Sequence, residues 1–256
     1  MNIIVCVKAV PAHAENPSIV DGGFKIRVES KSLVMNESDE HALEQALLIK
    51  KKCVTTVTVI TVGSIGSQDV LHRSLAKGAD AAIRVDGDEF DPNIISLKLA
   101  HAISKLSYDL IFTGVESLDG MSSQVGISLA VRLGVPFAYA VTKINGLDGG
   151  VVVIDRELGG GRQQTLKMPT PALLCMQPGT DTLTYPPAVK LVQVRRRPVP
   201  CWSLSDLGLT EDQLSCERKL RLVGIEPRKT SASIEWVTGN PEQIADRLLD
   251  TIKKAL

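Results

Sequence analysis

Short apolar runs alternate with segments of helical periodicity over the first half of the chain, from Asn2 to about Gly134. The apolar runs are rich in β-branched residues, which is typical of strands. We assign four strands to the runs at 2–8, 54–61, 81–86 and 109–113. Strands that alternate with helices in this way pair in parallel and are covered by helices. The pattern therefore predicts an α/β fold with a Rossmann-like parallel sheet.

The predicted helices have recognisable boundaries. Ser38 is followed by two carboxylates and then by apolar positions that share one helical face, which predicts a helix start. Pro92 falls in the first turn of another helix, where its missing N–H group costs nothing. Gly78 and Gly134 end two further helices, because glycine favours the conformation that follows the last helical turn.

The pattern changes after Gly134. Four strand-like pieces follow, joined by turn sequences such as LDGG and GGGR, and they predict an antiparallel extension of the sheet. Beyond residue 177 prolines are frequent and periodicity is weak until Asn240 and Pro241 start a terminal helix. We therefore expect an α/β domain over 1–177 and, over 178–256, an extended arm that lies on a partner subunit.

Composition narrows the classes of function. The 29 basic residues balance the 29 acidic residues, so no overall field attracts nucleic acid or a charged membrane. The five cysteines form no CxxC pair, and the four histidines show no zinc-ligand spacing, which favours a reducing, cytoplasmic location without structural zinc. The apolar run near the N-terminus is too short for a signal peptide or a membrane span.

The connection after the fourth strand, GVESLDGMSSQVG at 114–126, is richer in glycine, serine and carboxylates than a plain turn requires. In an open parallel sheet, ligands bind outside the carboxyl ends of the strands. Gly114 allows a sharp turn, and Gly120 allows a positive φ or the close approach of a ligand. Residues 122–124 offer donors at a helix N-terminus, which favours an anion. The connection predicts a site for a phosphate-bearing ligand.

Alternatively, Asp119, Ser122 and Ser123 only cap the helix. A second polar helix start at 36–39 weakens this alternative, because the two starts would converge on one cleft. Common catalytic and cofactor motifs are missing from the sequence: VGSIGS at 62–67 lacks GxGxxG spacing, and no P-loop, pyrophosphatase loop or nucleophile elbow is present. No aspartate has a histidine or second carboxylate at a readable spacing, so we do not expect catalysis by side chains.

Together these segments resemble the beta subunit of electron transfer flavoprotein, including FixA-like members. The resemblance rests on NIIVCVKAVP, VMNESDEHALEQALLIK, GADAAIRV, DLIFTGVESLDGMSSQVG and VIDRELGGGRQQTLKMPTPALLC, and it covers nearly the whole chain. Glu37 stands where the family usually has proline, and Gly159 stands where its signature usually has an acidic residue.

The resemblance implies a domain of the adenine nucleotide alpha hydrolase type, paired with an alpha subunit. The alpha subunit's mobile domain holds the electron-carrying FAD, and the beta subunit holds AMP or, in bifurcating members, a second FAD. His13 matches, weakly, a position near the alpha-bound flavin. The implied beta pocket comprises Cys6, Asn36, Glu37, Ser38, Asp39, Val62, Gly114, Val115, Glu116, Ser117, Leu118, Asp119, Gly120, Met121, Ser122, Ser123, Gln124 and Val125.

The sequence DGMSSQV at 119–125 indicates which of the two nucleotides is expected in the beta pocket. Family members with AMP commonly show D-D-D-x-N-Q, whereas those with a second FAD resemble D-G-D-T-A-Q-V. This chain agrees with the FAD pattern at Asp, Gly, Gln and Val, and Ser122 replaces threonine with another hydroxyl. Met121 departs from it. We expect FAD in preference to AMP, and with it electron bifurcation from NADH.

A loop of the family anchors acyl-CoA and other dehydrogenases, and residues 185–192 occupy its place. Ala188 stands where the anchoring leucine often lies, so Leu191 or Val192 is expected to make the contact. The alternative is an edge strand covered by the alpha subunit. Two other functions stay open: an ATP-binding regulatory module of the universal-stress-protein type, which lacks such an arm, and an independent dehydrogenase, which needs a cofactor fingerprint.

Overall fold

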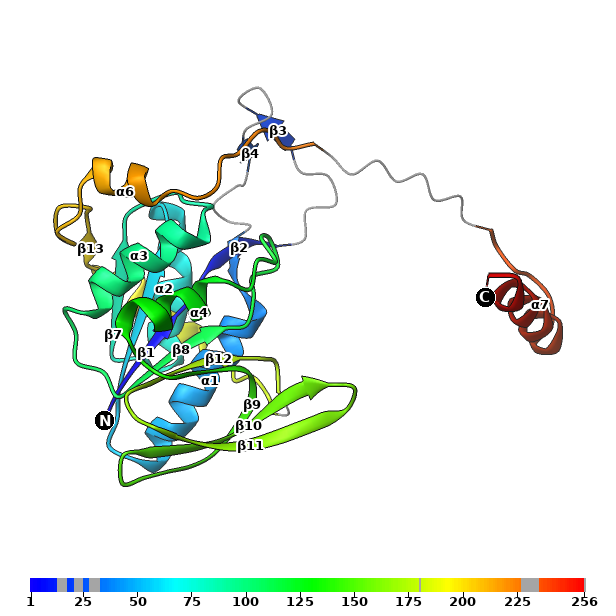
Figure 1. The fold of residues 1–256 in the computed structure, drawn as a ribbon, viewed down its shortest axis with the longest axis horizontal. Coiled ribbons are helices and arrows are strands. Elements are labelled where there is room, and N and C mark those ends of the chain that lie inside the picture. The colour runs from blue at the N-terminus through cyan, green and yellow to red at the C-terminus, as the bar shows by residue number, and fades with distance from the viewer. Residues whose placement is uncertain (13–17, 21–24, 28–32, 180, 227–234, 256) are drawn as a thin grey trace.

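The computed structural model describes residues 1–12, 18–20, 25–27, 33–179, 181–226 and 235–255. Within them a sheet of nine strands has the order β11-β10-β9-β12-β8-β1-β6-β7-β13 (Figure 1). The central strands are parallel, which confirms the predicted α/β fold. Their bounds are β1 (Asn2–Cys6), β6 (Thr56–Val62), β7 (Ala81–Val85), β8 (Leu110–Gly114) and β12 (Ala172–Met176).

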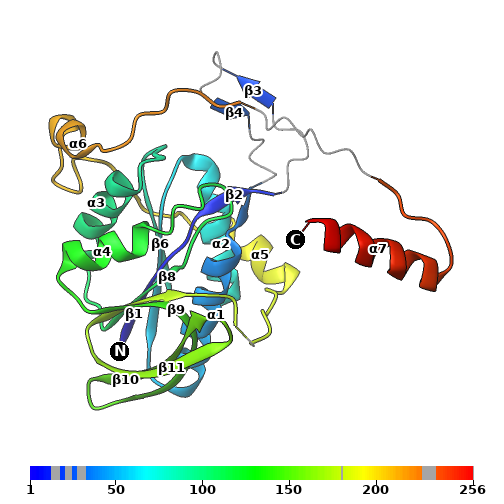
Figure 2. The same ribbon diagram turned by 45° about the vertical axis from the view of Figure 1, so that its right-hand side comes forward.

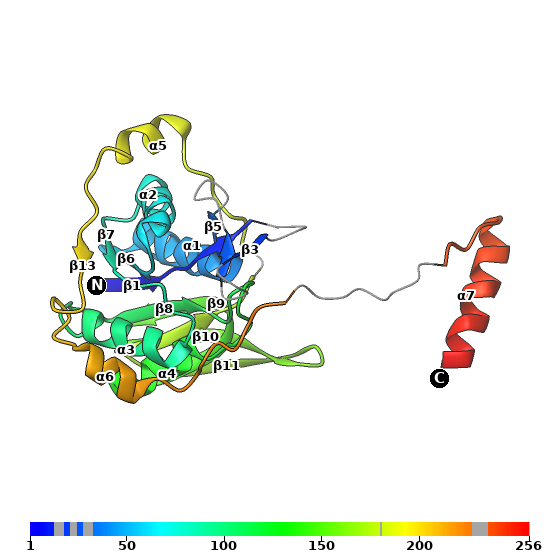
Figure 3. The same ribbon diagram turned by 90° about the horizontal axis from the view of Figure 1, so that it is seen from above.

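Helices cover both faces of this sheet (Figure 3). One layer contains α1 (Glu37–Lys52) and α2 (Gln68–Lys77), which follows the short 3₁₀ turn Ile65–Ser67. The other layer contains α3 (Pro92–Ile103) and α4 (Val125–Leu133). Successive strand residues point to opposite faces, so Ile3 and Val5 join the core under α1 and α2, whereas Ile4 and Cys6 join the core under α3 and α4.

The chain reverses direction across the sheet beside β1. From β1 it proceeds outward through β6 to β7, and α3 then carries it back to β8 on the other side of β1. Val5 therefore pairs with Val59 of β6 and with Phe112 of β8. Connections that leave neighbouring strands in opposite directions open a crevice at their carboxyl ends, where ligands of such folds bind.

The antiparallel extension is present for three of the four predicted pieces, whereas the fourth, β12, is a parallel strand between β8 and β9. The extension consists of β9 (Phe137–Asp148), β10 (Val151–Gly159) and β11 (Arg162–Pro169), with β9 running parallel to β12. The β10–β11 hairpin projects from the body (Figure 1). Two small hairpins were not predicted from the sequence: β2 (Ala9–Pro11) with β5 (Leu33–Met35), and β3 (Ser18–Val20) with β4 (Lys25–Arg27). His13 lies outside the described residues.

Much of the segment expected to be an arm folds back on the body. Helix α5 (Ala188–Val194) contacts α2, β13 (Cys201–Trp202) extends the sheet beside β7, and α6 (Glu211–Glu217) contacts α3. The alternative of an edge strand at 185–192 is wrong, because most of this stretch is helical. Helix α7 (Pro241–Ala255) stands apart from the body in every view (Figure 2). No helix among the described residues is long and apolar enough to cross a bilayer.

Candidate functional site

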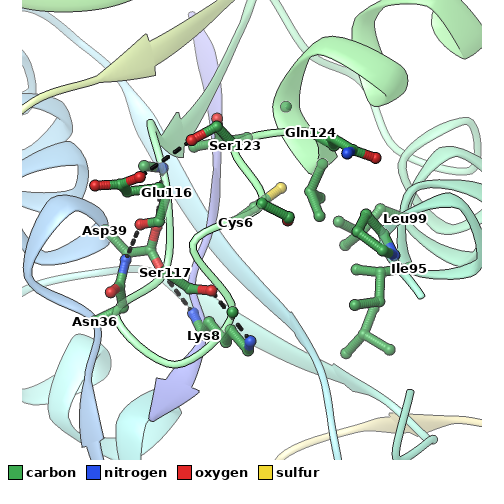
Figure 4. Close-up of a pocket in the computed structure, with 18 of the residues that line it drawn as sticks. Cys6, Lys8, Asn36, Asp39, Ile95, Leu99, Glu116, Ser117, Ser123 and Gln124 are labelled. Carbon is green, nitrogen blue, oxygen red and sulfur yellow. Dashed lines mark hydrogen bonds between the residues drawn. The ribbon is translucent and has the colours of Figure 1, made fainter. Parts of the chain in front are cut away.

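A cavity of about 360 Å³ lies at the carboxyl ends of β1, β6 and β8, bounded by the N-terminal ends of α1, α3 and α4 (Figure 4). Sites for small molecules commonly enclose about 300–1,000 Å³. The cavity is thus the crevice that the reversal of the chain beside β1 creates. One of its ends is polar and the other is apolar.

Two buried side chains at the start of α1 fix the polar end. The Asp39 carboxylate accepts hydrogen bonds from the backbone N–H groups of Lys8 and Gly114, each at 2.8 Å. The Asn36 amide donates to the Glu116 carbonyl at 2.7 Å and accepts from the Leu118 N–H group at 3.1 Å (Figure 4). The two polar helix starts therefore converge on one cleft, as the sequence predicts. Their contacts position the backbone of the site.

Burial raises the pKa of the Asp39 carboxyl to about 7, although hydrogen bonds from Lys8 and Gly114 act in the opposite direction. Burial also raises the pKa of the Cys175 thiol to about 11 and raises that of Cys6, which lines the cavity. Both cysteines therefore remain neutral thiols near pH 7. The cysteine in the cavity wall supplies bulk and no nucleophilic thiolate.

Lys8 brings a positive charge to the polar end. Its ammonium group donates to Asp119 Oδ1 at 2.6 Å. It also donates to Ser117 Oγ at 3.2 Å (Figure 4). Burial opposes ionisation of Asp119, but the Lys8 ammonium lowers the pKa of that carboxyl below its usual value. Lys8 was not among the predicted site residues. Its position directly after the first strand, at the carboxyl edge of the sheet, is the signal that indicates it.

The loop before α4 differs from the expectation in one respect. Positive φ angles occur at Met121 (44°) and Ser123 (53°), whereas Gly120 has none. Left-handed backbone at residues other than glycine is uncommon, and it concentrates at ligand sites. Alternation between right- and left-handed residues is the geometry by which successive N–H groups form anion-binding nests. We therefore retain the expectation of an anion for this loop and change its structural reason.

The capping alternative is not supported. Gln124 is the N-cap residue of α4 and makes no side-chain capping hydrogen bond. Asp119 pairs with Lys8, and the Ser123 hydroxyl donates to Glu116 Oε2 at 3.2 Å. The first N–H groups of α4 are therefore not satisfied by the side chains proposed to cap them.

Three glycines around the cavity serve different purposes. A Cβ atom at Gly114 would lie 2.3 Å from Asp39 Oδ1, and one at Gly126 would lie 2.6 Å from both Thr113 Oγ1 and Cys175 Sγ. These two positions require glycine because of close packing. At Gly120 the nearest atom, Ser117 Oγ, would be 3.3 Å away. The absence of a side chain at Gly120 therefore leaves room in the cavity.

The opposite end of the cavity is apolar. Ile95 and Leu99 of α3 face the polar groups from across the cavity (Figure 4), and the cavity lining also includes the apolar residues Val62, Phe90 and Leu220. A ligand that fits both ends would combine an anionic group with an apolar, ring-like group. Adenine nucleotides have this combination.

Most of the predicted site residues line this cavity, namely Cys6, Asn36, Asp39, Val62, Gly114, Val115, Glu116, Ser117, Gly120, Ser122, Ser123, Gln124 and Val125. The other predicted residues do not: Glu37, Leu118 and Met121 are exposed, whereas Ser38 and Asp119 support their neighbours. Sequence reasoning missed the lining residues Val7, Lys8, Ile60, Glu89, Phe90, Pro92, Ile95, Leu99, Thr113, Gly126 and Leu220. The start of α3 could have been found, because it follows a parallel strand.

Comparison with known proteins gives consistent matches. The family model described as electron transfer flavoprotein domain matches residues 25–201. The electron transfer flavoprotein subunit beta of Methylophilus methylotrophus is 33% identical over 230 residues, 87% of each chain. That of Bacillus subtilis (strain 168) is 30% identical over 261 residues, 99% of this chain and 98% of the relative. Protein FixA of Azorhizobium caulinodans is 31% identical over 226 residues, 84% and 79% of the two chains.

Proposed function

This chain belongs to the electron transfer flavoprotein beta subunit and FixA family, and from that premise we propose that its cavity binds an adenine nucleotide, FAD in preference to AMP. The family places the chain in electron transfer beside an alpha subunit. One observation carries the proposal: the loop predicted to bind phosphate lines a cavity with one polar and one apolar end. The match to the Bacillus subtilis relative includes the region after residue 177, which disfavours a stand-alone regulatory module.

The polar end suits the phosphates of the nucleotide. The Lys8 ammonium group and the N–H groups at the start of α4 would face negative charge, and the helix dipole adds to this attraction. Glu116, which also lines the cavity, offers a carboxylate to sugar hydroxyl groups. Val62, Ile95 and Leu99 would pack against the ring system.

The preference for FAD over AMP rests on residues 119–125. Gly120 and Ser122 line the cavity with little bulk and no charge, which suits a pyrophosphate that continues toward a flavin. Met121, the position that departs from the FAD pattern, is 69% exposed and does not line the cavity. Its departure therefore places no unsuitable group against the ligand.

We further propose electron bifurcation within a heterodimer. FAD bound in this cavity would supply the acceptor for a hydride from NADH. The two electrons of that hydride would go to different acceptors, one of them through the flavin of the alpha subunit. We propose that an acyl-CoA dehydrogenase or another dehydrogenase docks on the outer face of α5 and on the residues before it. Tyr185, Val189 and Val192 are exposed there, and Val192 is one of the two residues, with Leu191, that are expected to make the contact.

Gly120→Val tests the site. Its Cβ atom would lie 3.9 Å from the Lys8 ammonium nitrogen, and the two branches would fill space at the polar end, so we expect the purified complex to lose most of its beta-site nucleotide. Gly146→Val is the matched control, because a Cβ atom there meets nothing within 4 Å. Nucleotide released on denaturation is quantified by chromatography. Undiminished nucleotide in Gly120→Val would show that the glycine is only a turn residue.

A further inference from the structure

We propose that Leu220 is part of the nucleotide site and that Asp91 positions it, so that residues 218–220, here called the strap, close the apolar end of the cavity and slow release of the nucleotide. The inference rests on the proposed function. The strap follows α6, more than 90 residues along the chain from α3, against which it lies.

The Asp91 side chain holds the strap by accepting hydrogen bonds from the backbone of the strap. The Asp91 side chain is almost wholly buried, and its Oδ2 atom accepts hydrogen bonds from the N–H groups of Lys219 at 2.7 Å and Leu220 at 2.9 Å. Its Oδ1 atom accepts from the Asn93 N–H group at 2.9 Å and so caps α3. One carboxylate therefore fixes both the start of α3, which forms the apolar wall, and the segment that closes it.

A second carboxylate holds the side chain at the start of the strap. Glu89, which itself lines the cavity, accepts from the Arg218 guanidinium at 3.2 Å and from the Lys98 ammonium at 3.2 Å. Just before the strap, Glu217 accepts from Arg132 at 3.0 Å. The strap is thus attached at several points to elements that line or support the cavity.

Leu220 has the properties of a removable cover. It lines the cavity, as Phe90 and Ile95 do, yet 47% of it is exposed and it belongs to neither of the two buried cores. Lifting the strap would break its hydrogen bonds to Asp91 and the ion pair of Arg218 with Glu89, and would leave the cores intact. A ring bound at this end could leave by this route only after Leu220 had moved aside.

The test compares three variants of the purified complex with the alpha subunit. Asp91→Asn keeps a good capping residue for α3, because asparagine caps as well as aspartate. Its amide cannot accept from both Asn93 and the strap, so the strap is released. Leu220→Ala removes the side chain that covers the cavity and keeps the hydrogen bonds between Asp91 and the strap. Lys219→Ala is the control, because it removes an exposed side chain and retains the N–H group that Asp91 accepts from.

Two measurements are made. The dissociation rate is followed after loading with FAD, by flavin fluorescence, and separately after loading with radiolabelled AMP. We expect at least about tenfold faster release from Asp91→Asn and Leu220→Ala, and the wild-type rate from Lys219→Ala. Brief trypsin treatment reports the strap without reference to nucleotide, and we expect faster cleavage after Arg218 and Arg221 in Asp91→Asn.

The possible failures are distinguishable. Wild-type release rates in Asp91→Asn or in Leu220→Ala, from complexes that do bind nucleotide, would overturn the role of the strap and leave the proposed function standing. A wild-type complex that binds neither FAD nor AMP in the beta subunit would overturn the proposed function and, with it, this inference.

Discussion

Asp39 joins the ends of two neighbouring strands. Its two oxygens accept from N–H groups that follow β1 and end β8, so the crevice between these strands has a fixed width. The carboxyl is nevertheless buried, and burial raises its pKa to about 7. A group with this pKa changes charge near neutral pH, so its contribution to the free energy of unfolding depends on pH.

Asp39→Asn tests this dependence. The folded pKa of about 7 exceeds the unfolded value of 3.8, so the folded protein binds the additional proton between these values. The contribution of Asp39 is fully present below about pH 4 and is lost as pH rises through 7. We expect the free energy of unfolding of wild type, minus that of the variant, to fall between pH 4 and 8, by ~4 kcal/mol at most.

For Asp80→Asn we expect the opposite dependence of the free energy of unfolding on pH. Burial opposes ionisation of Asp80, but the hydrogen bonds from Lys50 and from the Val57 N–H group lower its pKa. Its contribution is therefore present above the unfolded pKa and is lost as pH falls. Urea denaturation at several pH values measures both variants. A difference between wild type and Asp39→Asn that stays constant from pH 4 to 8 would contradict the assigned pKa.

The positions of single residues were only partly predictable. Asp39 and Asn36 could be found, because polar residues at a helix start beside a parallel strand face the carboxyl edge. A positive φ or the close approach of a ligand was expected at Gly120, and the left-handed backbone occurs instead at Met121 and Ser123. In this loop the Met121 N–H group bonds the Ser117 carbonyl, and contacts of this kind override local preference.

A buried ionic cluster joins α1, α2 and the segment after β12. The Lys77 ammonium group lies 3.1 Å from Glu40 and 3.3 Å from Glu44, and only 2% of its side chain is exposed. Glu44 also accepts from the N–H and hydroxyl groups of Thr184. Burial opposes ionisation of Glu44, but the donors of Thr184 and Lys77 lower its pKa. The cluster attaches the start of the post-177 segment to the body.

We expect Lys77→Met to lower the free energy of unfolding by about 3 kcal/mol or more, because it leaves a buried carboxylate without its cation. Lys50→Met is the control, since the side chains of the Lys50–Asp80 pair are 29% and 40% exposed, and ion pairs that solvent reaches contribute about 1 kcal/mol or less. Denaturant unfolding of both variants at pH 7 provides the values. Equal losses in the two variants would contradict a special role for the buried cluster.

The central strands were predicted better than the short helices of the later segment. The apolar runs of β1, β6, β7 and β8 locate these strands to within one or two residues, because both of their faces are largely buried and carry mainly apolar residues. Helices α5 and α6 have seven residues each, too few for a clear period. The capping box of Thr210 and Gln213 was nevertheless readable in the sequence TEDQ.

Contacts between distant parts of the chain were not predictable. Leu220 lines the cavity at a point where Asp91, far away in sequence, accepts from its backbone. The boundary at residue 177 and the contact of an arm with a partner remain predictions. Helix α7 favours such a contact, since it stands apart from the body while Leu248, Leu249 and Ile252 are exposed on it. The heterodimer is therefore the proper sample for measurements of cofactor.

The central claim is that the cavity at the carboxyl ends of β1, β6 and β8 holds FAD. The most direct measurement is the cofactor content of the purified heterodimer, denatured and analysed by chromatography for FAD and AMP per pair of subunits. We expect two FAD and no AMP, with one of the two FAD molecules lost in Gly120→Val. One FAD with one AMP would contradict the preference for FAD and the bifurcation that depends on it. One FAD with no second nucleotide would contradict a nucleotide site in this chain.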